Sequence, residues 1–240
     1  VLSTALHAAE MGARTIAYRW KHDMNPVADG LAERIADLVP HSPIHRTPIT
    51  ALAIARYRAL KPRTHYLPIG ASVPLGALGH VNSALELAHQ IKRGEMPAPA
   101  RVVLPLGSGG TTAGLLLGFA IAGLKTEVIG ARVGPRLVVN RRNVFSLVRR
   151  TSRLIEKITG ERPPDVDPAR FRIAQQVYGG SYGRPLPRGV AAARILHDAT
   201  GIMLDDTYTV KAWAAALDEA QSAEGPVLFW LTFDASCLKN

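Results

Sequence analysis

A glycine-rich stretch that also carries three hydroxyl side chains gives the first indication of chemistry. Residues 107–112 read Gly-Ser-Gly-Gly-Thr-Thr, between an apolar run at 102–106 and a helical run at 113–122. A buried strand that enters a glycine-rich turn and then a helix builds an anion site, because free backbone N–H groups and the positive end of the helix dipole favour a phosphate. Ser108, Thr111 and Thr112 can add hydrogen bonds. The pattern predicts a phosphate-binding loop; the alternative is a loop that only turns the chain.

The neighbouring residues narrow the kind of phosphate ligand. A nucleoside-triphosphate loop needs Lys followed by Ser or Thr after its last glycine, whereas Gly114 is followed by two leucines. A dinucleotide pattern starting at Gly107 puts Thr112 where Gly or Ala belongs. It also needs an acidic residue at the end of the next strand, where this chain has Arg132. The sequence therefore favours neither a nucleoside triphosphate nor a dinucleotide as the ligand of this loop.

Charge raises the question of a nucleic-acid partner. The chain has 29 Lys and Arg against 19 Asp and Glu, a net charge of +10. Between Arg136 and Arg162, seven arginines and Lys157 face only two glutamates. Apolar residues recur among these charges at helical spacing, which favours an amphipathic helix over 137–159 with a solvated basic face. Aromatic residues are only 6% of the chain, so few could stack on bases. We expect no nucleic-acid partner.

Length and composition bound the class of protein. The 240 residues are enough for one large domain or two small ones. No apolar run approaches the ~18 residues that a membrane span needs, and the first residues lack the basic start and apolar centre of a signal peptide. The single cysteine, Cys237, cannot form an internal disulfide. We expect a cytoplasmic protein with no membrane partner, and we predict no metal site.

Alternating helices and strands must position the loop. Apolar periodicity predicts helices at 2–11, 28–39, 49–60, 83–91, 113–122, 137–159, 190–199 and 208–220, and strands at 15–20, 43–46, 65–69, 102–106, 127–133, 171–177 and 226–232. Such alternation indicates parallel βα units. We predict an α/β chain of two doubly wound parallel-sheet lobes, residues 1–78 and the larger 79–240, with a hinge at 74–82. A ligand cleft is expected between the lobes, beyond the carboxyl ends of the strands.

Three stretches together resemble one family. They are PIGASVPLGALGHVNSALELA at 68–88, LGSGGTTAGL at 106–115, and YGRPLPRGVAAARIL at 182–196 followed by GIMLDDTYTVKA at 201–212. In order and spacing they look like the pyridoxal-phosphate enzymes of the tryptophan-synthase-β fold type, in the branch of aminocyclopropanecarboxylate deaminase and D-cysteine desulfhydrase. The resemblance extends over nearly all of the chain. It implies the fold-type II architecture and pyridoxal 5′-phosphate as cofactor.

The resemblance assigns roles to particular residues. Those expected to hold the cofactor phosphate are Ser108, Gly109, Gly110, Thr111 and Thr112, with Thr232 facing the pyridine nitrogen. Tyr182 and Tyr208 match tyrosines on the substrate side, where a phenol can move protons when its pKa is lowered beside a cation. Without the resemblance, Tyr182 would be a turn residue and Tyr208 a packing residue. Ser72 matches a hydroxyl residue facing the cleft, and Lys211 a structural position.

Departures from the family pattern limit the functional expectation. The lysine to which the family attaches its cofactor, and its asparagine-containing loop, would precede Val1. We therefore expect the chain as given to lack catalytic competence, with Lys21 the nearest substitute. Val210 replaces a common glycine, and 231–234 reads Leu-Thr-Phe-Asp where the family often has His-Thr-Gly-Gly.

The expected activity is deamination or β-elimination on a small amino acid by a homodimer. The alternatives are a catalytically incomplete relative that binds a phosphate-bearing ligand, and a nicotinamide-dinucleotide dehydrogenase.

Overall fold

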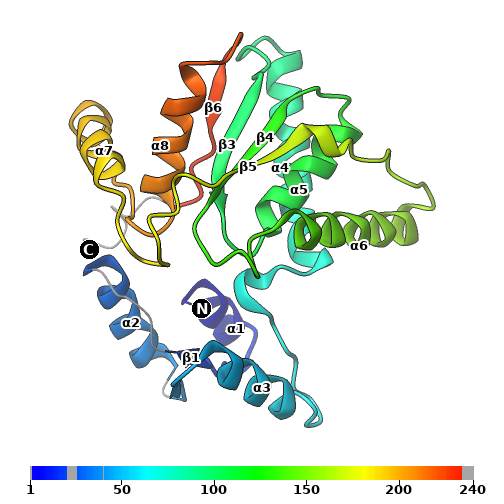
Figure 1. Ribbon diagram of the computed structural model, residues 1–240. Coiled ribbons are helices and arrows are strands. Elements are labelled where there is room, and N and C mark those ends of the chain that lie inside the picture. The colour runs from blue at the N-terminus through cyan, green and yellow to red at the C-terminus, as the bar shows by residue number, and fades with distance from the viewer. Residues whose placement is uncertain (1, 21–25, 40, 234–240) are drawn as a thin grey trace. The chain divides into compact units, whose positions relative to one another are not determined.

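The computed structural model describes residues 2–20, 26–39 and 41–233 (Figure 1). The chain forms two compact units, one running to Leu67 and the other beginning at Pro68. The boundary between the units therefore lies after Leu67, earlier than the boundary after residue 78 that the sequence predicts. Residues 68–78 belong to the larger unit because the segment at 74–82, expected as a hinge, is the start of a long helix that packs in that unit.

The smaller unit has a short parallel sheet and three helices. Its elements are α1 (Leu2–Glu10), β1 (Arg19–Trp20), α2 (Pro26–Leu38), β2 (Ile44–His45) and α3 (Pro48–Arg58). Strands β1 and β2 pair in parallel, with Arg19 opposite Ile44. Both strands are shorter than the predicted 15–20 and 43–46. The strand predicted at 65–69 is wrong: Ile69–Ala71 is a 3₁₀ turn, η1, in which Gly70 has φ +67°.

The larger unit is a four-stranded parallel sheet in the order β5-β4-β3-β6, with helices on both faces (Figure 1). Its strands are β3 (Arg101–Leu106), β4 (Glu127–Arg132), β5 (Phe171–Ala174) and β6 (Val227–Phe229). Its helices are α4 (Pro74–Lys92), α5 (Gly110–Ile121), α6 (Arg141–Thr159), α7 (Pro187–Thr200) and α8 (Thr209–Ala220), with a 3₁₀ turn, η2, at Pro168–Arg170. Adjacent strands run parallel throughout, so the predicted doubly wound α/β class is confirmed.

Side chains of β3 alternate between two cores. Val102 and Leu104 pack on the face covered by α4, α5 and α6, whereas Val103 packs on the face covered by α8. Helix α5 lies very close to α4, because a Cβ at Gly114 or Gly118 would come within 2.4–2.5 Å of a side chain of α4. The packing fixes the start of α5, where the phosphate loop is predicted.

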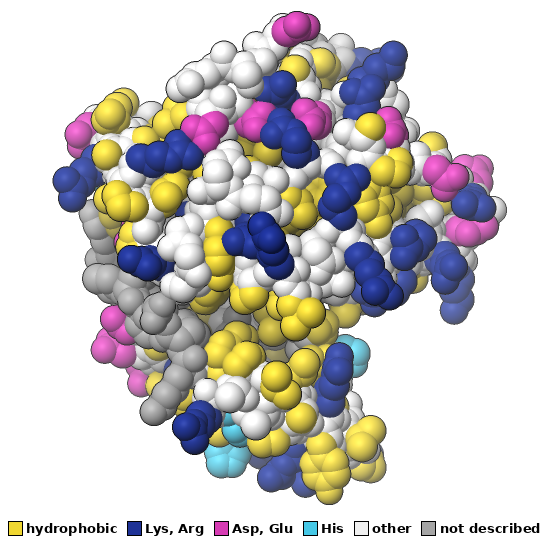
Figure 2. Space-filling model, viewed as in Figure 1, with side chains coloured by type: hydrophobic (Ala, Val, Ile, Leu, Met, Phe, Trp, Pro, Cys, Tyr) yellow, Lys and Arg dark blue, Asp and Glu magenta, His cyan; other side chains and the backbone are white. Residues whose placement is uncertain are grey.

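Helix α6 has the amphipathic character that its sequence predicts. Val144, Leu147 and Val148 are buried, while Arg149, Arg150 and Arg153 are exposed. Basic side chains gather along the α6 side of the larger unit in Figure 2. No helix among the described residues is both long enough and apolar enough to cross a membrane.

Candidate active site

The predicted phosphate loop connects β3 to α5. Strand β3 ends at Leu106, and α5 begins at Gly110 after the N-cap residue Gly109. Gly109 has φ +88°, a conformation that glycine adopts without the strain of a side chain. In the part of the chain that the structure describes, no side chain caps this helix start. The first N–H groups of α5 are therefore open to an anionic ligand.

One segment, residues 70–72, approaches the loop closely. A Cβ at Gly70 would lie 2.1 Å from Ser108 Oγ, and one at Gly110 would lie 3.0 Å from Ser72 Oγ. Ser72 Oγ donates a hydrogen bond to Ser108 Oγ at 2.8 Å. The structure therefore brings Ser72 to the loop, and its expected role on the substrate side stays a prediction.

The two threonines of the loop have different surroundings. Thr111 Oγ1 lies 3.2 Å from His80 Nε2, a contact between α5 and α4. Thr112 is 1% exposed, and its Oγ1 has no hydrogen-bond partner among the described residues. A buried hydroxyl without a partner is costly, since it has lost its hydrogen bonds to water. An unsatisfied hydroxyl, a glycine cradle and an uncapped helix start together fit a phosphate group.

Tyr182 and Tyr208 meet beside this loop. Their hydroxyl oxygens are 2.5 Å apart, and their rings meet edge to face with centroids 5.8 Å apart. A Cβ at Gly107 would lie 3.4 Å from Tyr208 Cε1, which places the Tyr208 ring against the start of the loop. The sequence alone could not exclude a turn residue and a packing residue; the structure brings the two phenols together at the loop.

Burial raises the pKa of both phenols. For Tyr182, burial is the main cause, opposed by the hydrogen bond to Tyr208. For Tyr208, burial acts with the nearby Tyr182 and the negative Asp205 to raise the pKa above the ordinary phenol range. Both hydroxyls therefore keep their protons at neutral pH. The expected lowering of a phenol pKa beside a cation is not found here, because burial raises both values.

Asp205 holds Tyr208 in place. Its Oδ2 accepts N–H groups of Thr207 and Tyr208 at 3.0 and 2.9 Å, and its Oδ1 accepts that of Thr209 at 3.0 Å. These bonds satisfy the N–H groups at the start of α8, which would otherwise lack partners. Asp205 is not among the predicted site residues, although an Asp before a helical run is a standard signal for a helix N-terminus.

Buried cations near the tyrosines are also not among the residues that the sequence predicts for the site. Lys211 is fully buried on α8, and Arg132 is 9% exposed at the end of β4. Arg132 Nε has no hydrogen-bond partner in the described residues. His80, half-buried on α4, has its pKa lowered by burial. Two sequence features could have pointed to these cations: Arg132 stands at the end of a buried strand, and Lys211 stands in an apolar helix.

Other predicted residues are not joined to this group. Thr232 is exposed after β6. Lys21 and Cys237 lie outside the described residues. The expected cleft between the lobes concerns both units, and the structure describes each by itself.

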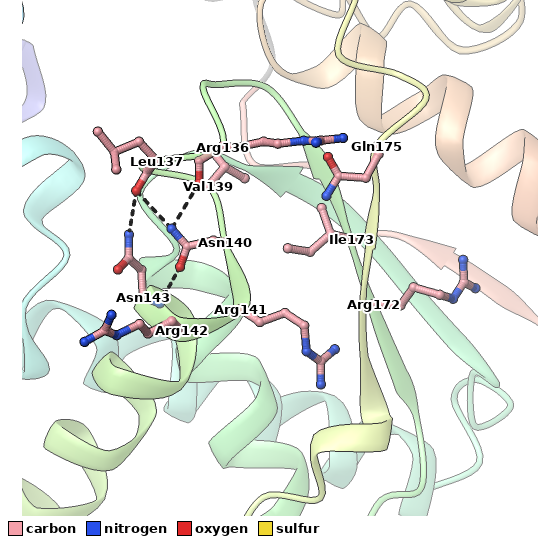
Figure 3. Close-up of a pocket in the computed structure, with 10 residues that line it drawn as sticks. All are labelled: Arg136, Leu137, Val139, Asn140, Arg141, Arg142, Asn143, Arg172, Ile173 and Gln175. Carbon is pink, nitrogen blue, oxygen red and sulfur yellow. Dashed lines mark hydrogen bonds between the residues drawn. The ribbon is translucent and has the colours of Figure 1, made fainter.

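A separate pocket lies where α6 begins beside β5, with a volume of about 790 Å³ (Figure 3). None of its lining residues is a predicted site residue. Arg141 donates to carbonyls of Pro168 and Phe171, and Arg172 pairs with Glu219. Asn140 accepts the N–H of Asn143. Since its polar groups serve the fold in this way, the candidate active site remains the phosphate loop with the tyrosine pair. No cluster of three potential metal ligands occurs in the described ranges.

Comparison with known proteins identifies relatives over most of the chain. A family model described as "Pyridoxal-phosphate dependent enzyme" matches residues 1–232. Nocardicin C-9′ epimerase of Nocardia uniformis subsp. tsuyamanensis is 30% identical over 257 aligned positions, covering 97% of this chain and 71% of the epimerase. D-cysteine desulfhydrase of Klebsiella pneumoniae subsp. pneumoniae is 33% identical over 180 positions. That alignment covers 73% of this chain but only 52% of the desulfhydrase, so the chain spans about half the length of that relative.

Solved structures share the fold. An ACC deaminase homologue has a TM-score of 0.73 and 24% identity, covering 95% of this chain and 68% of that structure. O-ureido-L-serine synthase has a TM-score of 0.61 and 18% identity, covering 99% and 70%. At these identities the likeness shows the fold alone, which confirms the expected architecture.

Proposed function

Because the chain belongs to the family of pyridoxal-phosphate-dependent enzymes, we propose that residues 108–112 bind the cofactor phosphate and that the site acts on a small amino acid. The reaction we propose is deamination or β-elimination. The D-cysteine desulfhydrase relatives support this reaction type, and the ACC deaminase homologue shares the fold. The observation that carries the proposal is the pair of tyrosine hydroxyls, 2.5 Å apart and beside the phosphate loop.

The phosphate contacts follow from the loop. The N–H groups at the start of α5 would bind phosphate oxygens, helped by the helix dipole. Thr112 would donate its unpartnered hydroxyl, and Ser72 would orient Ser108 through their hydrogen bond. Thr232 remains the proposed partner of the pyridine nitrogen.

The tyrosines would handle protons. The cofactor, when bound, supplies an electron sink for negative charge that develops at the amino acid's α-carbon. Raised pKa values keep both phenols protonated at neutral pH. In this form Tyr208 can hydrogen-bond the substrate while Tyr182 hydrogen-bonds its oxygen, and transfer of the proton needs a cation in the loaded site that lowers the pKa of Tyr208. Burial beside the loop also excludes water, which strengthens these hydrogen bonds.

A turnover assay tests the reaction type. Protein loaded with pyridoxal phosphate is offered D-cysteine, L-cysteine or 1-aminocyclopropanecarboxylate, and sulfide and ammonia are measured. We expect the chain as given to bind the cofactor without turnover, because the lysine to which the family attaches its cofactor has no match in it. In a form that carries this lysine, we expect release from at least one substrate, lowered roughly 10²–10⁴-fold by Tyr208→Phe if its phenol transfers a proton. Cofactor binding without any turnover by that form would favour the catalytically incomplete relative.

Epimerisation is a second candidate, favoured by the relative that aligns with 97% of this chain. Inversion at the α-carbon also requires proton removal and return, so the same tyrosines could serve it. Incubation in D₂O separates the two. An epimerase would incorporate deuterium at the α-carbon and invert its configuration without releasing ammonia, whereas a deaminase or desulfhydrase would release ammonia.

Assembly, location and the interlobe cleft are also proposals. The resemblance supports a homodimer and a cofactor cleft between the two lobes, and the single cysteine fits a reducing cytoplasm. Sedimentation equilibrium of the purified protein tests the first of these, since a monomer at micromolar concentration would contradict it.

A further inference from the structure

Lys211 is an unusual residue for a helix core. It lies one turn after Tyr208 on α8, has no exposed surface, and donates from Nζ to the carbonyl oxygen of Ser181 at 3.2 Å. A buried ammonium is expensive unless the structure compensates it with partners. The chain directly after that carbonyl carries Tyr182, so Lys211 connects the two segments that supply the tyrosine pair.

The ring of Tyr178 lies close to Lys211 and to a second cation, Arg132. Arg132 Cζ is 3.9 Å from the centroid of the Tyr178 ring, and Lys211 Nζ is 5.6 Å from it. Cations over an aromatic face are attracted by the negative π-surface. The ring therefore ties the segment between β5 and α7 to both β4 and α8. Two attachments, at Tyr178 and Ser181, come immediately before Tyr182.

We propose that Lys211 is a positioning residue, which fixes the segment 178–182 through the Ser181 carbonyl and the Tyr178 ring so that the hydroxyl of Tyr182 meets that of Tyr208. Its catalytic consequence rests on the proposed function of the tyrosine pair. The positioning itself concerns only contacts within this chain, and it can be tested without cofactor or substrate.

The groups around Lys211 make this anchor sensitive to pH. Burial, helped by Arg132 from β4, lowers the pKa of Lys211 to about 8, although Asp205 and Asp206 from the loop before α8 oppose the shift. A charged donor makes a stronger hydrogen bond than a neutral one. The hold on Ser181 is therefore strongest below pH 8 and weakens as the ammonium loses its proton.

Nuclear magnetic resonance of tyrosine labelled with ¹³C at Cζ tests the proposal on the full chain between pH 6.5 and 9.5. In the parent, the Tyr178 and Tyr182 signals should shift together with a midpoint near pH 8. Lys211→Met keeps the length and apolar packing but removes the amine. It should abolish this shared transition and move the Tyr182 and Tyr208 signals at pH 7. Lys157→Met, on the exposed face of α6, is the control and should match the parent.

Each outcome decides. A Lys211 that only packs the core would change the melting temperature and leave the tyrosine signals and their pH response as in the parent; that result overturns the proposal, as does a transition that persists in Lys211→Met. If Lys211→Met does not fold, the parent titration decides, and the absence of a common midpoint overturns the proposal. A parent protein that shows the shared transition but does not bind pyridoxal phosphate would instead contradict the proposed function.

Discussion

The hydroxyls of Tyr182 and Tyr208 are 2.5 Å apart, although 26 residues separate them in the chain. One comes from the segment between β5 and α7, the other from the N-cap position of α8. The contact exists because Asp205 fixes the backbone at Tyr208, while Lys211 and Arg132 hold the segment that carries Tyr182.

Burial of this pair predicts late ionisation of its phenols. In a spectrophotometric titration, phenols in the ordinary range ionise near about pH 10, whereas the Tyr182 and Tyr208 hydroxyls should stay neutral beyond it. A pKa raised by folding means that stability is lost as the pH rises above the unfolded value, here about 10. Tyr208→Phe should leave the early ionisation unchanged and reduce this alkaline loss. Ionisation of all six tyrosines near pH 10 in the folded protein would contradict the prediction.

The unpartnered hydroxyl of Thr112 predicts opposite effects on stability and on binding. Thr112→Val removes a buried polar group that lacks a partner, so urea unfolding should show stability unchanged or raised by about 1 kcal/mol. The same change should weaken pyridoxal-phosphate binding roughly tenfold or more, because hydrogen bonds to charged groups contribute about 1.5–3 kcal/mol.

Thr151 offers a matched control for this variant. It is fully buried on α6, and its Oγ1 likewise has no partner among the described residues. Thr151→Val should change stability in the same direction without altering cofactor affinity. Equal affinities of Thr112→Val and the parent would remove Thr112 from the proposed phosphate site.

Sequence patterns predicted the elements of the larger unit well, because buried parallel strands and amphipathic helices have strong periodicities. Strand β3 and helix α6 illustrate this. The start of α4 was missed, since Pro74 and the glycines at 76 and 79 favour a loop by propensity alone. Proline is nevertheless well suited to the first helical turn, and the packing of α4 on α5 stabilises the rest.

The site was only partly predictable for a related reason. The phosphate loop is contiguous in sequence, whereas the contacts of Lys211 with Ser181 and of Arg132 with Tyr178 join segments 30 to 46 residues apart. No local pattern reports such contacts. The sequence therefore predicts only a structural role for Lys211, because its burial and its partner Ser181 are visible only in the structure.

Glu219 lies at the amino ends of the strands, and we expect its substitution to change stability alone. This buried carboxylate accepts hydrogen bonds from Arg101 at 2.8 Å and from Arg172 at 2.7 and 2.8 Å, which join α8 to β3 and β5. Glu219→Gln removes the charge that both arginines pair with. It should lower the free energy of unfolding by about 1.5–3 kcal/mol, the range for hydrogen bonds to charged groups.

Cofactor affinity should not follow that loss. The Glu219 cluster lies at the opposite ends of the strands from the phosphate loop. Folded Glu219→Gln should therefore bind pyridoxal phosphate as the parent does. A variant as stable as the parent would show that this cluster contributes little.

The most direct measurement is an absorbance titration of the purified protein with pyridoxal phosphate, comparing the parent with Gly110→Val. The added side chain would start 3.0 Å from Ser72 Oγ, at the point where the phosphate is proposed to approach. Gly79→Val, in α4 where a Cβ meets nothing within 4 Å, controls for placing valine in a helix. We predict saturable binding by the parent and by Gly79→Val, and a loss of at least tenfold in affinity for folded Gly110→Val. Equal affinity of all three proteins would contradict the assignment of residues 108–112 as the phosphate site.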